Sequence, residues 1–171
     1  MTMDRIDPQP AADERTTLNE FLDFLRATLL GKTEGLDAAG LNRRLLPSTL
    51  TLGGLLKHLA LVEDYWIQEK FLGLPELEPW ASAPWAEDRD WDFHSAAEDD
   101  PDALRSLYQS ACERSRQALA GADLSALSVG TDRDGAHWNL RWILTHLIEE
   151  TARHCGHADL LREAVDGTVG E

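Results

Sequence analysis

Helical periodicity, interrupted only by glycine and proline, is the feature that most constrains how this chain can fold. In the first long segment the apolar residues recur every three or four positions, at Leu18, Phe21, Leu22, Leu25 and Leu29. This spacing places them on one face of a helix. Long β-branched runs, which are typical of strands, are absent from the sequence. Hydrophobic residues make up 43% of the 171 residues, which is enough for one sizeable core. The pattern predicts an all-α domain.

Capping and turn residues divide the chain into four predicted helices, at about 14–30, 51–73, 100–120 and 139–165. Thr51 and Asn139 are typical N-caps, and Asp100 followed by proline is a typical helix start. Gly167 follows the last helix, where a glycine commonly ends it. Because helices of this length bury their apolar faces against one another, we expect a four-helix bundle.

The remaining segments are predicted to be a tail and connectors. Residues 1–12 are expected to form a disordered N-terminal tail, which leaves 13–171 as a single domain. Segments 36–50 and 122–137 are expected connectors, and the second contains the turn signal Asp134-Gly135. Residues 74–99 form a long loop rich in Trp, Pro and Asp, which either covers a functional site or is a solvated connector.

The formal net charge of −15 disfavours two classes of partner. Nucleic acids and anionic membrane surfaces are bound through basic patches, so neither is the expected partner. No apolar stretch approaches the roughly 20 residues of a membrane span, and the N-terminal segment lacks the apolar core of a signal peptide. Two cysteines, Cys112 and Cys155, are too few for a disulfide framework. We therefore expect a cytoplasmic protein that acts on a small molecule.

The last predicted helix carries ionisable residues on its apolar face. At about 100° per residue, His154 lies within about 40° of a stripe formed by Ile143, Leu147, Ala158, Leu161 and Val165. His146, Glu150 and His157 lie on the same side of the helix. Burying an ionised carboxylate without a partner is costly, so this patch needs compensation. A divalent metal ion is the expected compensation.

Spacing suggests which residues hold the metal. Glu150 and His154 are four residues apart and can bind one ion, and His58 on the second helix supplies a third ligand. His146 and Glu150 are an equally well-spaced pair, so His146 is an alternative to His154 as a ligand. If His146 is not a ligand, we expect it to lie beside the ligands, and we expect the same of His157. Two histidines, one carboxylate and open positions suit zinc, nickel or ferrous iron.

Other candidates near this site are assigned by their direction on the helices. Tyr65, two turns after His58, is expected to border the open metal position. Cys155 points about 100° away from the ligand line and is expected to be structural. Three tryptophans are expected to pack between helices: Trp66, Trp138 and Trp142.

The segments HLALVEDYW and EETARHCGHADLLREAVDG resemble the DinB superfamily of metal-binding four-helix bundles. That family has one His in the second helix, and in the last helix a His or Glu four residues before a His. The matching residues here are His58, Glu150 and His154. With Glu150 in the middle position, the set resembles the mycothiol-dependent maleylpyruvate isomerase branch more than the three-His branch. The common Arg-Gly-Gln after the last His is replaced by Cys155-Gly156-His157.

The resemblance implies a DinB/YfiT-like four-helix bundle with a thiol co-substrate. In such proteins the metal binds a low-molecular-weight thiol, such as mycothiol or bacillithiol, whose thiolate attacks a small electrophile. A thiol-dependent transferase or isomerase is therefore the expected function. Two alternatives stay open: a metal-dependent hydrolase with Glu63, His146 or Glu149 as base, and a non-enzymatic, stress-associated bundle stapled by its metal. A homodimer through the apolar face of the first helix is also compatible with the sequence.

Overall fold

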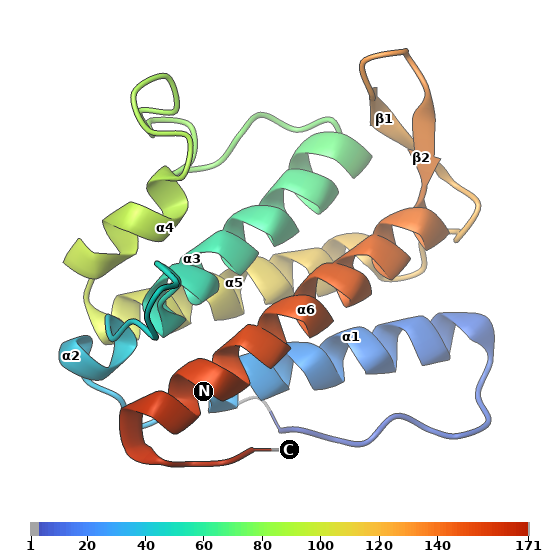
Figure 1. The fold of residues 1–171 in the computed structure, drawn as a ribbon. Coiled ribbons are helices and arrows are strands. Elements are labelled where there is room, and N and C mark those ends of the chain that lie inside the picture. Colours follow the sequence, from blue (N-terminus) through green and yellow to red (C-terminus); the bar gives the residue numbers. More distant parts are fainter. Residues whose placement is uncertain (1–3, 171) are drawn as a thin grey trace.

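The computed structural model describes residues 4–170 and is mostly helical (Figure 1). Four long helical segments form its frame: α1 (Glu14–Gly31), α3 (Leu52–Glu63) with its continuation η1 (Asp64–Phe71), α5 (Pro101–Leu119) and α6 (Leu140–Asp166). The predicted four-helix bundle is therefore confirmed. None of the helices in residues 4–170 has the length and apolar character needed to cross a bilayer.

The helix ends follow from the capping residues that the sequence indicates. Thr51 accepts a hydrogen bond from the backbone N–H of Gly54, and Asn139 accepts one from Trp142. Asp100 caps α5 in the same way, with Pro101 in the first turn. Each cap satisfies an N–H that has no partner inside its helix. Gly167 ends α6 in the left-handed conformation, at φ 78°.

The second predicted helix changes its winding halfway along. It is an α-helix through Glu63 and a π-helix from Asp64, so that Leu72 N–H donates to the carbonyl of Ile67, five residues earlier, at 3.0 Å. The prediction of one continuous helix over 51–73 is confirmed, but the α-helical spacing assumed for its second half is wrong. Side-chain directions beyond Asp64 therefore depart from the 3.6-residue period.

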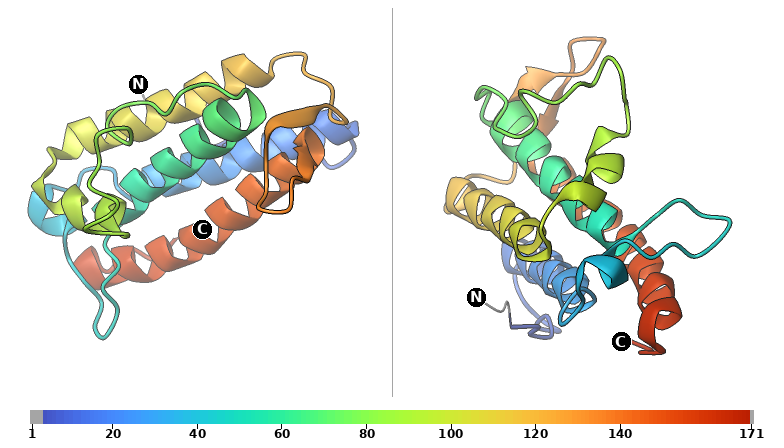
Figure 2. Two further views of the ribbon diagram at one scale, coloured as in Figure 1. Left: turned by 90° about the horizontal axis from the view of Figure 1, so that it is seen from above. Right: turned by 90° about the vertical axis from the view of Figure 1, so that its left-hand side faces the viewer.

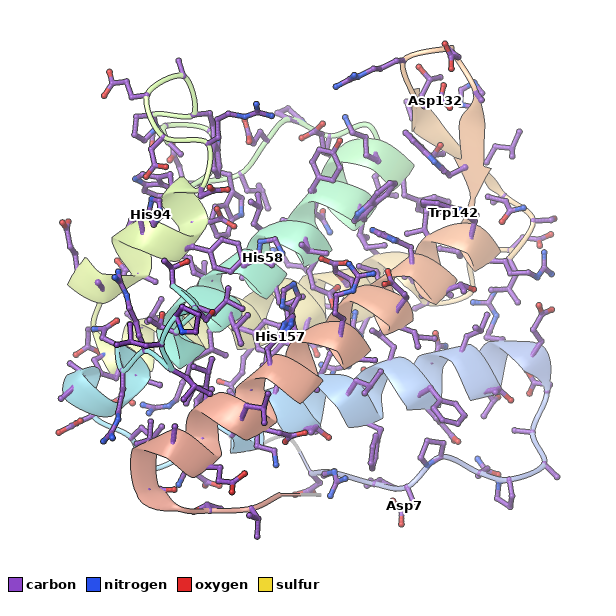
Figure 3. All side chains as sticks on the ribbon, viewed as in Figure 1. Asp7, His58, His94, Asp132, Trp142 and His157 are labelled. Carbon is purple, nitrogen blue, oxygen red and sulfur yellow. The ribbon has the colours of Figure 1, made fainter. Side chains whose placement is uncertain are left out.

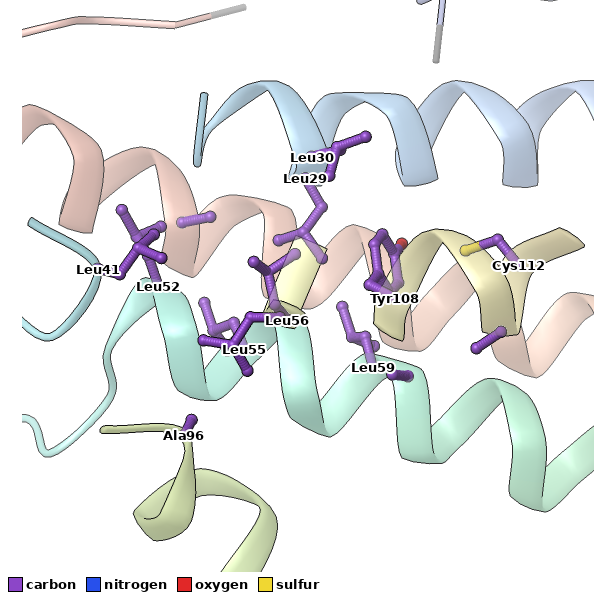
Figure 4. Close-up of a cluster of buried hydrophobic side chains, with 14 of the residues drawn as sticks. Leu29, Leu30, Leu41, Leu52, Leu55, Leu56, Leu59, Ala96, Tyr108 and Cys112 are labelled. Atoms are coloured by element: carbon purple, nitrogen blue, oxygen red, sulfur yellow. The ribbon is translucent and has the colours of Figure 1, made fainter. Parts of the chain in front are cut away.

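The long helices bury their apolar stripes against one another. α1 packs on α6, and α3 packs on both α5 and α6. One core cluster joins α1, α3 and α5 (Figure 4); its fully buried members include Leu29, Leu55, Leu56, Leu59 and Tyr108. A second cluster lies around Leu22, Ile67, Leu140, Ile143 and Leu147. Each such leucine or isoleucine stabilises the fold by about 1.5–3 kcal/mol relative to an exposed one.

The connector 74–99 has structure of its own, contrary to its assignment as a loop. It contains α4 (Trp91–Ser95) and the 3₁₀ turn η2 (Ala96–Glu98), which lie beside α3 (Figure 1). Trp80 is 1% exposed, and its indole N–H donates to Asp64 Oδ2 at 3.0 Å. The tryptophans of this segment therefore attach it to the bundle. A single helical turn, α2 (Ala38–Leu41), lies in the earlier connector.

The connector 122–137 contains part of a β-hairpin that the sequence analysis did not predict. Strands β1 (Leu127–Thr131) and β2 (His137–Asn139) pair antiparallel, with Leu127 opposite Asn139 and an irregular register between the ends. The predicted Asp134-Gly135 turn joins them, with Gly135 at φ 83°. The hairpin stands at the opposite end of the bundle from α2 (Figure 2). The predicted helical bundle is thus confirmed as a mostly helical fold, to which this small hairpin is added.

The predicted tail, residues 1–12, falls partly outside the described residues, which begin at residue 4. Residues 4–12 run along α1 (Figure 1). Arg5 Nε donates to Thr28 Oγ1 at 3.0 Å, and its guanidinium lies 4.3 Å from the centre of the Phe24 ring. Gln9 donates to the Glu20 carboxylate through its backbone and side-chain N–H groups. This stretch is therefore held in place by contacts with the first helix.

Candidate metal centre

Three of the predicted residues converge between α3 and α6. His58, Glu150 and His154 each offer one ligand atom, and these atoms lie within 4.8 Å of one another. Glu150 Oε1 is 3.3 Å from His154 Nε2 and 3.6 Å from His58 Nε2. The carboxylate therefore stands between the two imidazoles. The cluster brings together residues more than 90 positions apart in the sequence.

Helix geometry produces this convergence. Glu150 and His154 lie one turn apart on α6, so their side chains project from the same face. Gly53 and Gly54 in the first turn of α3 let neighbouring segments approach closely: the Cβ of an alanine at position 54 would lie 3.2 Å from Phe93 Cδ1. Figure 3 shows His58 on α3 and His157 on α6, and His157 is three residues after His154.

The spacing of the three donor atoms fits a divalent metal ion. A tetrahedral ion with ligands at about 2.0–2.1 Å has its donors about 3.3 Å apart. Both measured separations from Glu150 Oε1, 3.3 and 3.6 Å, are close to that value. Two imidazole nitrogens with one carboxylate oxygen are also a common catalytic zinc set, which leaves further positions for other ligands. With all three donor atoms within 4.8 Å of one another, these residues are candidate ligands of one such ion.

The second ring nitrogen of each histidine also has a partner. His58 Nδ1 lies 2.7 Å from Asp92 Oδ2, and the His58 ring stacks on Phe93 with centroids 4.4 Å apart. His154 Nδ1 lies 3.2 Å from His157 Nδ1. The contact with the Asp92 carboxylate favours the arrangement in which His58 carries its proton on Nδ1 and directs its Nε2 lone pair toward the ligand cluster.

Asp92 is a site residue that the sequence analysis missed. It lies on α4, within the segment assigned to a structureless loop. Its side chain is only 5% exposed. The segment contains six acidic residues between 87 and 99, and no spacing rule distinguishes this one. Only its burial against His58, which requires α4 to fold onto α3, identifies it.

Two other candidate residues lie in an aromatic cluster near the hairpin. The His146 ring stacks on Trp142 with centroids 5.2 Å apart and 17° between planes, and meets Trp66 edge-on. Trp66 contacts Trp142 across η1 and α6, as expected for interhelix packing, whereas its contact with Trp138 joins η1 to strand β2. Tyr65 contacts Trp66 and has Lys70 Nζ 4.6 Å from its ring centre. The cluster of three ligand atoms includes neither His146 nor Tyr65.

Burial and mutual charge adjust the protonation of the ligands. Burial, followed by the positive charge that His58 can carry, lowers the pKa of His154 to about 4. Burial raises the pKa of Glu150, but the neighbouring His154, His58 and His146 outweigh it, so this pKa is lowered overall. At neutral pH the ligands are therefore an ionised carboxylate and a neutral imidazole at position 154. That combination favours a cation between them.

The ligands are partly accessible to solvent, whereas the protein thiols are not at the site. The side chains of His58 and Glu150 are 19% and 17% exposed, so a small molecule can reach the cluster. Cys155 lies on another face of α6, where its Sγ is 3.4 Å from the Leu25 carbonyl oxygen. Burial, with the negative charge of Asp159, raises the pKa of the Cys155 thiol to about 12. The structural assignment of Cys155 agrees with this placement.

Comparison with known proteins identifies the family. A sequence model described as mycothiol-S-transferase matches residues 17–167, which is nearly the whole chain and includes all three clustered residues. No curated protein matches the chain. The matched region begins in α1 and ends at the glycine that terminates α6. The chain therefore belongs to the mycothiol-S-transferase family.

Proposed function

We propose that this protein is a divalent-metal-dependent transferase that joins the sulfur of mycothiol to a small electrophile. The observation that carries the proposal is the cluster of His58, Glu150 and His154, whose donor atoms lie within 4.8 Å of one another, with Glu150 Oε1 3.6 and 3.3 Å from the two histidine nitrogens. The family match adds the thiol, because membership implies a mycothiol-dependent S-transferase. Zinc, nickel and ferrous iron all suit these ligands.

The reaction needs little from the chain beyond the site itself. A bound divalent cation lowers the pKa of a coordinated thiol, so that thiolate is present at neutral pH. The mycothiol sulfur then forms a bond to the electrophilic carbon, the leaving group departs with the electron pair, and the thiol proton passes to solvent. His58, Glu150 and His154 would hold the cation, and their partial exposure would leave it accessible to the co-substrate.

Bases considered for a hydrolase have other partners in the structure. Glu63 is 2% exposed and accepts two hydrogen bonds from Arg26, at 2.6 and 2.7 Å. Glu149 forms an ion pair with Arg153. His146 is stacked on Trp142. These contacts favour the thiol reaction, in which the sulfur nucleophile comes from the co-substrate.

Metal analysis combined with a conjugation assay tests the proposal. Protein purified without an affinity metal should contain about one equivalent of zinc, nickel or iron. With mycothiol and an activated aryl halide, it should form the mycothiol conjugate, detected by mass spectrometry. Chelation should stop the reaction and added metal should restore it.

Two substitutions make the test specific to the site. His154→Ala should lose both metal and conjugation, whereas His94→Ala should retain them, because the half-exposed His94 pairs with Asp88 instead. A protein that takes up no metal, or a His154→Ala variant that conjugates at the original rate, would overturn the proposal. Release of a rearranged substrate with mycothiol regenerated would instead identify an isomerase.

A further inference from the structure

The segment between α3 and α5 contributes directly to the environment of His58. Asp92 Oδ2 lies 2.7 Å from His58 Nδ1, on the side of the ring opposite the nitrogen that faces Glu150. Phe93, the next residue, stacks on the same ring at 4.4 Å with 23° between the planes. The hydrogen bond and the stack together fix the direction and the plane of the His58 ring.

The Asp92 carboxylate is placed where it needs a strong partner. Its side chain is 5% exposed, and an ionised carboxylate removed from water is costly unless it is paired. This carboxylate forms a hydrogen bond with the His58 imidazole. A second Asp–His pair on the same segment, Asp88 with His94, has side chains 32% and 58% exposed. The two pairs have the same chemistry, but only the first is buried beside the donor cluster.

Residues of α3 that precede His58 hold α4 in this position. Lys57 is 3% exposed, its ammonium lies 2.5 Å from Asp99 Oδ2, and it lies 4.3 Å from the centre of the Trp91 ring. Gly54 leaves room for Phe93, whose backbone oxygen would be 3.3 Å from an added Cβ. α4 is therefore attached to α3 on both sides of Asp92.

We infer that Asp92 is a positioning residue of the metal centre, and that α4 belongs to that centre. Asp92 accepts the Nδ1–H of His58, which keeps the proton off Nε2 and directs the Nε2 lone pair at the ion between His58 and Glu150. A carboxylate in this position also makes the imidazole a stronger donor. The inference rests on the proposed function, because it requires that His58 bind a metal.

Metal affinity measures this role without reference to activity. Loss of such a partner typically weakens metal binding 10–100-fold. We expect a loss of this size for Zn²⁺ binding to Asp92→Ala, measured by competition with a chromogenic chelator. Asp92→Asn keeps the shape and an accepting oxygen but loses the charge, so its loss should be smaller. The matched control, Asp88→Ala, should bind Zn²⁺ as the unmodified protein does.

Two further readouts separate positioning from simple structural support. The absorption spectrum of the Co²⁺-substituted protein should change in Asp92→Ala and stay unchanged in Asp88→Ala. Because coupling between binding and packing is reciprocal, Zn²⁺ should slow amide hydrogen exchange at 91–95 in the unmodified protein. If Asp92→Ala does not fold, Asp92→Asn decides the affinity question. Circular dichroism of the metal-free proteins establishes which variants fold.

The outcomes separate this inference from the proposed function. If the unmodified protein binds Zn²⁺ but folded Asp92→Ala binds it within twofold and with the same Co²⁺ spectrum, Asp92 has no positioning role and the inference is wrong. If the unmodified protein itself binds no metal, the proposed function fails and the inference fails with it. Weakened binding confined to the Asp92 variants supports both.

Discussion

Both cysteine thiols are protected from reaction by burial. Cys112 is 0% exposed and Cys155 is 6% exposed. Burial raises the pKa of each thiol to about 12, assisted by the negative charge of Glu63 at Cys112 and of Asp159 at Cys155. Since thiolate is the reactive form, these thiols are poor nucleophiles at physiological pH. This agrees with the proposed reaction, in which the reacting thiol is that of the co-substrate.

Thiol labelling tests this consequence. In the native protein at pH 8, a disulfide reagent should label both cysteines far more slowly than in guanidinium chloride, where both should react at once. Cys155→Ala should keep its conjugation activity, because in the proposed reaction the sulfur that is transferred belongs to mycothiol. Rapid labelling of the native protein, or an inactive but folded Cys155→Ala, would contradict this view.

A buried ion pair links α1 to α3 and contributes to stability. Arg26 and Glu63 are 3% and 2% exposed and form two hydrogen bonds, at 2.6 and 2.7 Å. Glu63→Gln removes the charge opposite a buried guanidinium, and breaking a buried pair in this way costs about 3–5 kcal/mol. Because Asp23 also contacts Arg26, we expect the free energy of unfolding to fall by about 3 kcal/mol, measured by urea denaturation. Glu14→Gln, which breaks the exposed pair with Arg141, should change stability much less.

The residues that could be predicted from sequence are those whose partners lie on a regular helix. Glu150 and His154 are one turn apart, so α-helical spacing alone places them together. His58 followed because it is the single histidine of its helix and shares that helix's apolar face. Asp92 could not be found in this way, since its contact with His58 depends on how a connector folds back across α3.

At the scale of elements, two helical glycines have opposite surroundings: Gly54 in the first turn of α3 and Gly156 within α6. A Cβ at Gly54 in α3 would lie 3.0 Å from Thr51 Oγ1 and 3.2 Å from Phe93 Cδ1. A Cβ at Gly156 in α6 would meet nothing within 4 Å. The same substitution by alanine should therefore have opposite effects at the two positions.

Thermal unfolding of the metal-free variants tests this difference. Gly156→Ala should stabilise the protein by about 0.5–1 kcal/mol, because alanine restricts the unfolded chain and favours the helix. Gly54→Ala gains the same helix preference, but overpacking of this kind costs about 1–3 kcal/mol and should exceed the gain. Equal effects of the two substitutions would show that Phe93 does not pack tightly on α3.

Element boundaries were predictable where a local signal exists and not where packing decides. The caps at Thr51, Asp100 and Asn139 act within their own first turn, so the helix starts were predicted correctly. The π-helical winding from Asp64, the helix α4 and the strand β1 have no comparable local signal. β1 packs on η1, and the Val129 side chain fills the space beside Gly73. These elements depend on contacts with distant segments, which override local preference.

At the scale of the whole molecule, the outer face of α1 is the surface through which the homodimer compatible with the sequence would form. Most of its apolar stripe is used within the chain: Leu22 and Leu29 are 1% and 0% exposed and belong to the two core clusters. Phe21 is 46% exposed and lies outside them. A dimer through α1 therefore stays a proposal, and light scattering of the purified protein tests it directly.

The candidate metal centre and the apolar core involve the same helices in different ways. A metal ion held by His58, Glu150 and His154 would link α3 to α6, and the contact of Asp92 with His58 would add α4. The core clusters independently join α1 to α6 and α3 to α5 through buried leucines, isoleucines and aromatic residues. Apolar burial dominates the stability of a domain this size, so the bundle should fold without its metal. This expectation separates a metal enzyme from a bundle that depends on metal as a staple.

Removal of the metal tests that distinction on the intact protein. After dialysis against a chelator, the far-UV circular dichroism spectrum should stay helical and thermal unfolding should stay cooperative, at a lower midpoint. Adding metal to 100 times its Kd should restore about 2.7 kcal/mol of stability, because the ion binds the folded state alone. The His154→Ala variant should show no such recovery. If the chelated protein instead loses its cooperative transition, the metal is needed for folding, and a structural role for the ion becomes the better account of the same three ligands.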